Sequence, residues 1–106
     1  MQQGTIRNDE IVGVCTVAIR ARAVLKATYN GAEMTLHPHQ LVERNDATYL
    51  RAVNPAKNRR EDEEAALGFY HLAGMSEVVL EGRQFEPLAE ERLAPARETD
   101  RVIESV

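Results

Sequence analysis

The sequence predicts a mainly β domain with one N-terminal helix, in which the strands form a small antiparallel barrel or a curled sheet. The chain has 106 residues, which is the size of a single domain. Its first apolar segment follows a helical spacing. After that segment, about five short stretches rich in β-forming residues alternate with turn residues at roughly 8–12-residue spacing, as in small all-β folds.

The expected helix covers residues 11–23. Asn8 or Asp9 can cap it, because both side chains accept hydrogen bonds from the free N–H groups of a first turn. A strand stays as the alternative, since the segment is rich in Val, Ile and Thr, and Gly13 weakens a helix by about 1 kcal/mol relative to Ala. The residues that recur at helical spacing are Ile11, Cys15, Ala18, Ile19 and Arg22.

Three strands are expected in the middle of the chain, over residues 24–29, 33–42 and 47–53. Asn30-Gly31 separates the first two strands and suits a tight hairpin turn, because both residues tolerate a positive φ. Residues 44–46 form the second turn. Pro38 has no backbone donor, so it marks a sheet edge or a bulge within the second strand.

The second half of the sequence predicts shorter secondary-structure elements. A charged run over residues 57–64 is typical of a solvated linker. Two short strands follow, at residues 68–72 and 77–80, and Glu81-Gly82 forms a turn after the second of them.

A charged tail is expected beyond residue 87. It holds a short helix at residues 90–93 and then either a helical turn at residues 99–103 or disorder. The chain therefore divides into a flexible N-terminus, a barrel domain and the tail, over residues 1–8, 9–87 and 88–106.

Composition and charge exclude several functional classes. The chain has 13 Lys and Arg against 17 Asp and Glu, so its formal net charge is −4. A domain that binds nucleic acid mainly by neutralising phosphates is usually basic, so the overall balance disfavours that role while allowing a local patch. No apolar run reaches the roughly 18 residues of a membrane span. Cys15 lacks a disulfide partner and no signal peptide is visible, so a cytoplasmic location is expected.

Several short motifs then follow one another along the chain in an order that can be compared with a known family. An Arg-bearing helix leads into a strand that ends at Tyr29, and later segments contain Pro38 with Leu41, Thr48-Tyr49-Leu50, Tyr70-His71-Leu72-Ala73-Gly74-Met75 and Phe85-Glu86-Pro87. In this order and spacing, residues 19–87 resemble a WYL domain, a family named for a Trp-Tyr-Leu tripeptide. Thr48 stands where the family has Trp, Met34 where it has Arg, and Ala73-Gly74 where it has Asp-Arg.

The resemblance implies an Sm-like or SH3-like antiparallel barrel whose surface binds ligands, among them nucleotides and single-stranded nucleic acid. Members of the family commonly stand beside a DNA-binding helix-turn-helix and regulate transcription, often in bacterial defence. Too few residues precede the barrel here for a helix-turn-helix, so we expect no element that reads duplex DNA.

Five residues form the expected ligand-binding set: Tyr49, Arg51, His37, His39 and His71. Tyr49 and Arg51 lie two residues apart on one strand face, so a base can stack on the ring while the guanidinium binds its phosphate. The alternative for Tyr49 is a core or rim aromatic. His37 and His39 also share a strand face, but a zinc site needs three or four ligands, so no metal is expected.

Arg59 and Arg60 are candidate phosphate contacts, although the carboxylates from Glu61 onward favour a solvated linker with internal ion pairs. No catalytic arrangement is visible: Cys15 is typical of a small buried hydrophobe, and the isolated glycines form no phosphate-binding loop. We therefore expect neither an enzyme nor a cofactor.

Two functions remain. The first is a non-enzymatic regulatory module that binds a small anionic ligand, a nucleotide or single-stranded nucleic acid on its barrel surface. The alternative is a structural or protein-interaction domain, a homodimer or partner subunit without a small ligand, because an edge strand can pair with a second chain.

Overall fold

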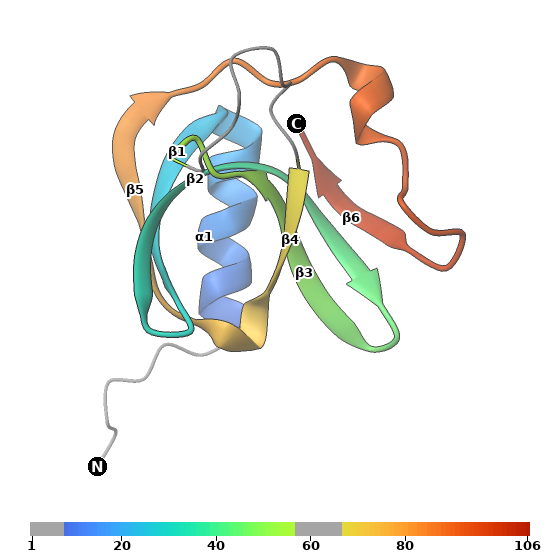
Figure 1. Ribbon diagram of the computed structural model, residues 1–106, viewed down its shortest axis with the longest axis horizontal. Coiled ribbons are helices and arrows are strands. Elements are labelled where there is room, and N and C mark those ends of the chain that lie inside the picture. The colour runs from blue at the N-terminus through green and yellow to red at the C-terminus, as the bar shows by residue number, and fades with distance from the viewer. Residues whose placement is uncertain (1–7, 57–66) are drawn as a thin grey trace.

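The computed structural model describes residues 8–56 and 67–106, which form one helix and a curved antiparallel sheet (Figure 1). The elements in chain order are α1 (Asn8–Ala21), β1 (Ala23–Tyr29), β2 (Ala32–Arg44), β3 (Ala47–Val53), β4 (Leu67–His71), the 3-10 helix η1 (Leu72–Gly74), β5 (Met75–Gln84), the 3-10 helix η2 (Glu90–Leu93) and β6 (Arg101–Ser105). The predicted class, mainly antiparallel β with an N-terminal helix, is confirmed.

The six strands form one sheet in the order β4-β3-β2-β1-β5, and β6 pairs with β2. Among the described residues no pairing joins β4 to β5, so the sheet curls around the core without closing into a barrel.

The first segment is a helix, as predicted, and it ends at Ala21 rather than at residue 23. Asp9 and Glu10 lie in its first turn and Arg20 in its last, where each charge is stabilised by the helix dipole. Arg22 leaves the helix with a φ of 53°. The predicted apolar stripe is buried against the sheet, as Ile11, Cys15, Ala18 and Ile19.

Two tight turns set the register of the central strands. Asn30 and Gly31 have φ values of 50° and 85° and close the β1–β2 hairpin, as predicted. Asn45 and Asp46 close the β2–β3 hairpin with φ values of 51° and 66°, so this turn has two residues and Arg44 still belongs to β2. A positive φ at both central residues gives a turn whose twist matches that of the strands.

Pro38, predicted to mark a sheet edge or a bulge, lies at a bulge. Pro38 pairs with Ala52 and Gln40 with Arg51, so His39 is an extra residue in β2. An extra residue reverses the alternation of side chains along a strand. Leu36 and Leu41 are therefore both fully buried, although an odd number of positions separates them. Burying a Leu side chain contributes about 1.5–3 kcal/mol, so this bulge directs both ends of β2 into one core.

Two predictions about the second half are wrong. Glu81-Gly82 is not a turn, because β5 continues to Gln84. Gly82 has a φ of 108° and lies where the β1–β5 register shifts, so its conformational freedom serves a bulge. Leu72 belongs to η1 rather than to the preceding strand.

The C-terminal tail is part of the sheet. The predicted short helix is present as η2, but residues 101–105 form β6 instead of a helical turn or a disordered segment. β6 pairs with β2 over Gln40–Glu43, beyond the part of β2 that pairs with β1. In Figure 1 the orange-to-red segment passes over the top of the molecule and returns beside β2 and β3. Of the predicted flexible N-terminus, residues 1–8, the first seven lie outside the described residues, and Asn8 begins α1.

Candidate functional site: a cation–aromatic face

Aromatic and cationic side chains gather on the face of β2, β3 and β4 that points away from the core. We call this the cation–aromatic face, and its residues are Arg44, Tyr49, Arg51, Phe69 and His71. The strand register sets Tyr49 opposite His71 and Arg51 opposite Phe69, and residues opposed in this way project from the same side of a sheet. Leu50, the next residue along β3, projects the other way and is fully buried, so Tyr49 lies on the outer face.

The rings of this face form a stacking platform. The rings of Tyr49 and His71 are stacked, with centroids 4.9 Å apart and planes 26° apart. Phe69 meets Tyr49 edge to face at a centroid distance of 6.1 Å. Tyr49 is half-buried and His71 is exposed, so the platform is open to solvent on the side of His71.

Arg44 lies over these rings and is paired with Asp100. Its guanidinium carbon is 4.5 Å from the Phe69 ring centroid and 5.4 Å from that of Tyr49, which is cation–π distance. Nε and Nη2 of Arg44 donate to the two carboxylate oxygens of Asp100 at 2.6 and 2.8 Å. The two side chains are 12% and 1% exposed. The hydrogen bond from Arg44 lowers the pKa of Asp100.

Arg51 has a different environment, made of neutral acceptors. Nη1 donates to Gln40 Oε1 at 3.1 Å and to the Ala94 carbonyl at 2.8 Å, and Nη2 donates to the Arg92 carbonyl at 3.4 Å. Its guanidinium carbon is 5.5 Å from the Phe69 centroid. Burial lowers the pKa of Arg51. Within residues 8–56 and 67–106 it forms no ion pair, and its buried Nε has no hydrogen-bond partner. No carboxylate of these residues therefore neutralises its charge by contact.

The C-terminal segment, residues 88–106, covers one side of the cation–aromatic face. Gln40 Nε2 donates to the Leu93 carbonyl at 2.8 Å, and Arg101 forms an ion pair with Glu43. The N–H of Val106 donates to the His39 carbonyl at 2.9 Å. A ligand that approaches Arg44 or Arg51 therefore meets this segment, while His71 lies outside it.

His37 and His39 are not part of this face. Both rings lie against Phe85 at centroid distances of 5.0 Å. His39 is 1% exposed, its Nε2 accepts from the Leu88 N–H at 3.1 Å, and its Nδ1 therefore carries the proton donated to the His37 carbonyl at 2.8 Å. The prediction that His39 lies on an open ligand-binding surface is wrong, because the bulge at this position buries it. Burial lowers the pKa of both imidazoles.

The remaining sequence candidates are Arg59, Arg60 and Cys15. Arg59 and Arg60 lie outside the described residues. Cys15 is buried in the core, and burial raises the pKa of its thiol to about 12. In the part of the chain that the structure describes, no three His, Cys, Asp or Glu side chains gather in a way that could hold a metal ion.

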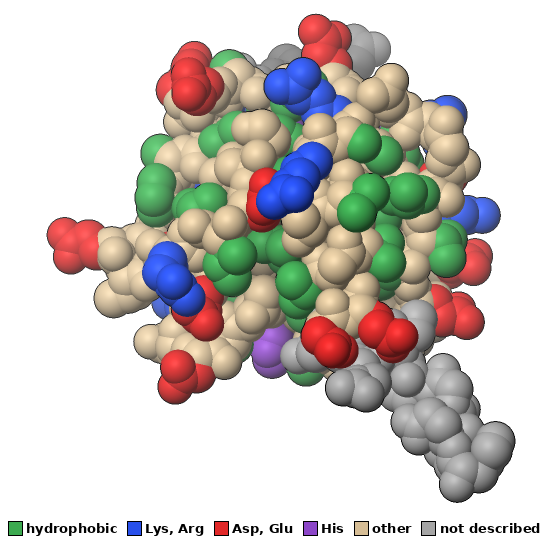
Figure 2. Space-filling model, turned by 180° about the vertical axis from the view of Figure 1, so that it is seen from behind, with side chains coloured by type: hydrophobic (Ala, Val, Ile, Leu, Met, Phe, Trp, Pro, Cys, Tyr) green, Lys and Arg blue, Asp and Glu red, His purple; other side chains and the backbone are tan. Residues whose placement is uncertain are grey.

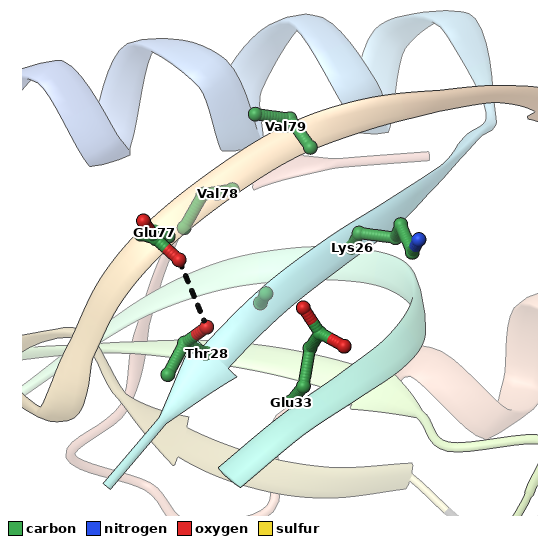
Figure 3. A pocket seen from close by; sticks show the side chains of 7 residues that line it. Lys26, Thr28, Glu33, Glu77, Val78 and Val79 are labelled. Carbon is green, nitrogen blue, oxygen red and sulfur yellow. Dashed lines mark hydrogen bonds between the residues drawn. The ribbon is translucent and has the colours of Figure 1, made fainter. Parts of the chain in front are cut away.

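A hollow of about 350 Å³ lies elsewhere on the sheet, over β1 with β2 and β5 on its flanks (Figure 3). Lys26, Glu33 and Glu77 supply its charges, and Thr28 Oγ1 donates to Glu77 at 3.4 Å. Two carboxylates against one ammonium group repel an anion, so this hollow suits an anionic ligand less well than the cation–aromatic face does.

A wider apolar groove of about 670 Å³ lies between α1 and β5. Val17, Val79 and Leu80 line it and are 52%, 56% and 47% exposed. In Figure 2, hydrophobic side chains lie between charged ones over much of the visible surface, including the right side, where β5 lies in this view.

No protein-family model matches the chain, and a search of curated proteins finds no similar sequence. Among the described residues, no helix has the length and apolar character needed to cross a bilayer.

The sequence predicts Tyr49, Arg51 and His71 as members of one binding site. It does not predict Arg44, Phe69 or Asp100, which the structure adds. Phe69 lies two residues before His71, so strand alternation could have placed it on the same face. Arg44 was assigned to a turn, and its place on the face follows only from the two-residue length of that turn. Asp100 gives no local signal, since it reaches the face through β6.

Proposed function

We propose that this chain is a non-enzymatic binding module of WYL type, which binds a nucleotide or single-stranded nucleic acid on its cation–aromatic face. The observation that carries this proposal is the Tyr49–His71 stack, with centroids 4.9 Å apart, beside the guanidinium of Arg44 at 5.4 Å from Tyr49. A base can stack on the open side of such a platform, because every base offers a π face.

The charges of the face support an anionic ligand. Arg44 is neutralised by Asp100. Among the described residues Arg51 bonds only to carbonyl and amide oxygens, so its positive charge attracts anions at short range. A phosphate that reached Arg44 would have to displace the Asp100 carboxylate. We therefore assign base stacking to Tyr49 and His71 and the electrostatic attraction mainly to Arg51.

The family part of the proposal rests on the sequence resemblance. The structure adds a curled antiparallel sheet whose outer face carries Tyr49, which is the kind of surface that the proposed binding needs. A cytoplasmic location is part of the proposal, since the single cysteine, Cys15, is a buried thiol.

Fluorescence anisotropy with a labelled single-stranded oligonucleotide tests the proposal. We expect binding that weakens steeply with salt. Because a base–aromatic stack contributes about 1–3 kcal/mol, Tyr49→Ala should weaken binding by roughly 5- to 150-fold. Lys26→Ala, which removes an exposed cation from β1, is the matched control and should change little. Binding that is absent in the wild type, or unchanged in Tyr49→Ala, would contradict the proposal.

A second candidate function is protein interaction. It is favoured by the apolar groove between α1 and β5, where Val17, Val79 and Leu80 are all about half exposed. Exposed apolar side chains that line one groove are more typical of an interaction surface than scattered single ones.

A further inference from the structure

β5 is an open edge of the sheet. It pairs with β1 on one side, and within the described residues no strand pairs with its other side. Such an edge presents backbone N–H and C=O groups that can pair with another strand. From Met75 to Leu80 it contains no proline and one charged residue, Glu77. The devices that usually prevent edge-to-edge pairing are therefore scarce along this part of β5.

The apolar groove follows the same edge. Leu80 pairs with the buried Leu25 and so projects to the core side of the sheet, where Val14 and Val17 of α1 form the opposite wall. Leu80 is nevertheless 47% exposed, because α1 does not cover the outer part of β5. A strand added to this edge would bring its own side chains over the groove.

We propose that β5 pairs antiparallel with β5 of a second copy of this chain, around a two-fold axis. This inference rests on the second candidate function, protein interaction, and names its partner. A two-fold interface must be complementary to itself, since each residue that contacts a partner residue is contacted by it in return. The charges along β5 meet that condition in two registers, centred on Leu80 and on Gly82, and only the first also sets Leu80 opposite its own copy.

The register centred on Leu80 sets Glu77 of each copy opposite Arg83 of the other, which gives two pairs of opposite charge, and it sets Leu80 opposite its own copy above the groove. A register centred on Val79 would instead set Glu77 opposite Glu81, which are both negative. Arg83 bonds to Glu81 within the chain, but its side chain is 69% exposed and can reach a partner's carboxylate.

Sedimentation velocity over a micromolar concentration range tests this inference. We expect a monomer–dimer equilibrium for the wild type. Glu77→Arg and Arg83→Glu should each weaken the dimer by about tenfold, because each replaces two attractive pairs by repulsive ones. The double variant Glu77→Arg/Arg83→Glu should restore it. Glu90→Arg, which reverses an exposed charge on η2, is the control and should leave the dimer unchanged.

Leu80→Asp supplies an independent variant and should abolish the dimer while circular dichroism shows an intact fold. A wild type that stays monomeric, an assembly larger than a dimer, or a double variant that fails to recover would overturn the inference. The same variants are measured for oligonucleotide binding. A monomer that still binds the oligonucleotide would refute only the dimer, and a dimer that binds none would refute only the ligand-binding function.

Discussion

Arg44 and Asp100 are 56 positions apart in the sequence and are joined by two parallel hydrogen bonds of 2.6 and 2.8 Å. The pair attaches the segment before β6 to the end of the β2–β3 hairpin, on the edge of the cation–aromatic face. A bidentate guanidinium–carboxylate pair is directional as well as strong, so it fixes how the C-terminal segment lies.

Asp100→Asn should therefore lower the free energy of unfolding at neutral pH. Arg44 lowers the pKa of Asp100 below its ordinary value of 3.8, so the stabilisation is present above that pH and is lost as the pH falls through the lowered pKa. Urea unfolding at several pH values should show a difference between variant and wild type that shrinks in acid. Asp46→Asn, in the exposed hairpin turn, is the control; an equal loss in both variants would refute the role of the pair.

His39 should make the protein less stable in mild acid. Its folded pKa lies below 6.5 because of burial, so below pH 6.5 the unfolded state binds more protons and stability falls with pH until the folded pKa is reached. Urea unfolding between neutral and mildly acidic pH should show this slope. His39→Gln should reduce the slope, whereas His71→Gln, at an exposed position, should keep it. A His39→Gln profile that matches the wild type would count against the buried neutral imidazole.

Cys15 should be inert in the folded protein. It is fully buried, and burial raises the pKa of its thiol to about 12, so almost no reactive thiolate exists near neutral pH. A thiol reagent should label the native protein only at the rate of unfolding and should label the urea-unfolded protein at once. Rapid labelling of the native protein would mean that α1 does not pack on the sheet as described.

Leu50→Ala should cost about 2–5 kcal/mol of stability, because it leaves a cavity in the core, where Leu50 is fully buried. Val17→Ala removes an exposed side chain from α1 and should change stability by less than about 0.5 kcal/mol. Thermal or urea unfolding measures both. Similar losses in the two variants would contradict the assigned inner and outer faces.

Local signals predicted the fold as far as β4. The apolar stripe of α1, the positive-φ turn at Asn30-Gly31 and the missing donor of Pro38 each act within a few residues, and each was placed correctly. β6 could not be found in this way, since its partner in β2 lies about 60 positions away along the chain and the contacts that hold it, such as Arg44 with Asp100, are not local. The turn predicted at Glu81-Gly82 is wrong because a glycine suits a turn and a bulge equally well, and the sequence does not distinguish the two.

The candidate site shows the same limit. Alternation along β3 puts Tyr49 and Leu50 on opposite faces, but only the structure shows that Leu50 is the buried one. The prediction that His39 lies on an open surface is wrong because one extra residue in β2 reverses the alternation of side chains along the strand. Pro38 marks the bulge in the sequence, but it does not show which side chain the bulge buries. Phe69 and Arg44 joined the face only once the strand register was known.

The location of the bound ligand tests the central claim most directly. Amide chemical shifts of the isotopically labelled protein would be followed by nuclear magnetic resonance during titration with a nucleoside monophosphate. We expect saturable shifts at Tyr49, Arg51, Phe69 and His71, with little change along α1 and β5. Shifts confined to the groove between α1 and β5, or no shifts at all, would show that the cation–aromatic face is a structural surface and not a binding site.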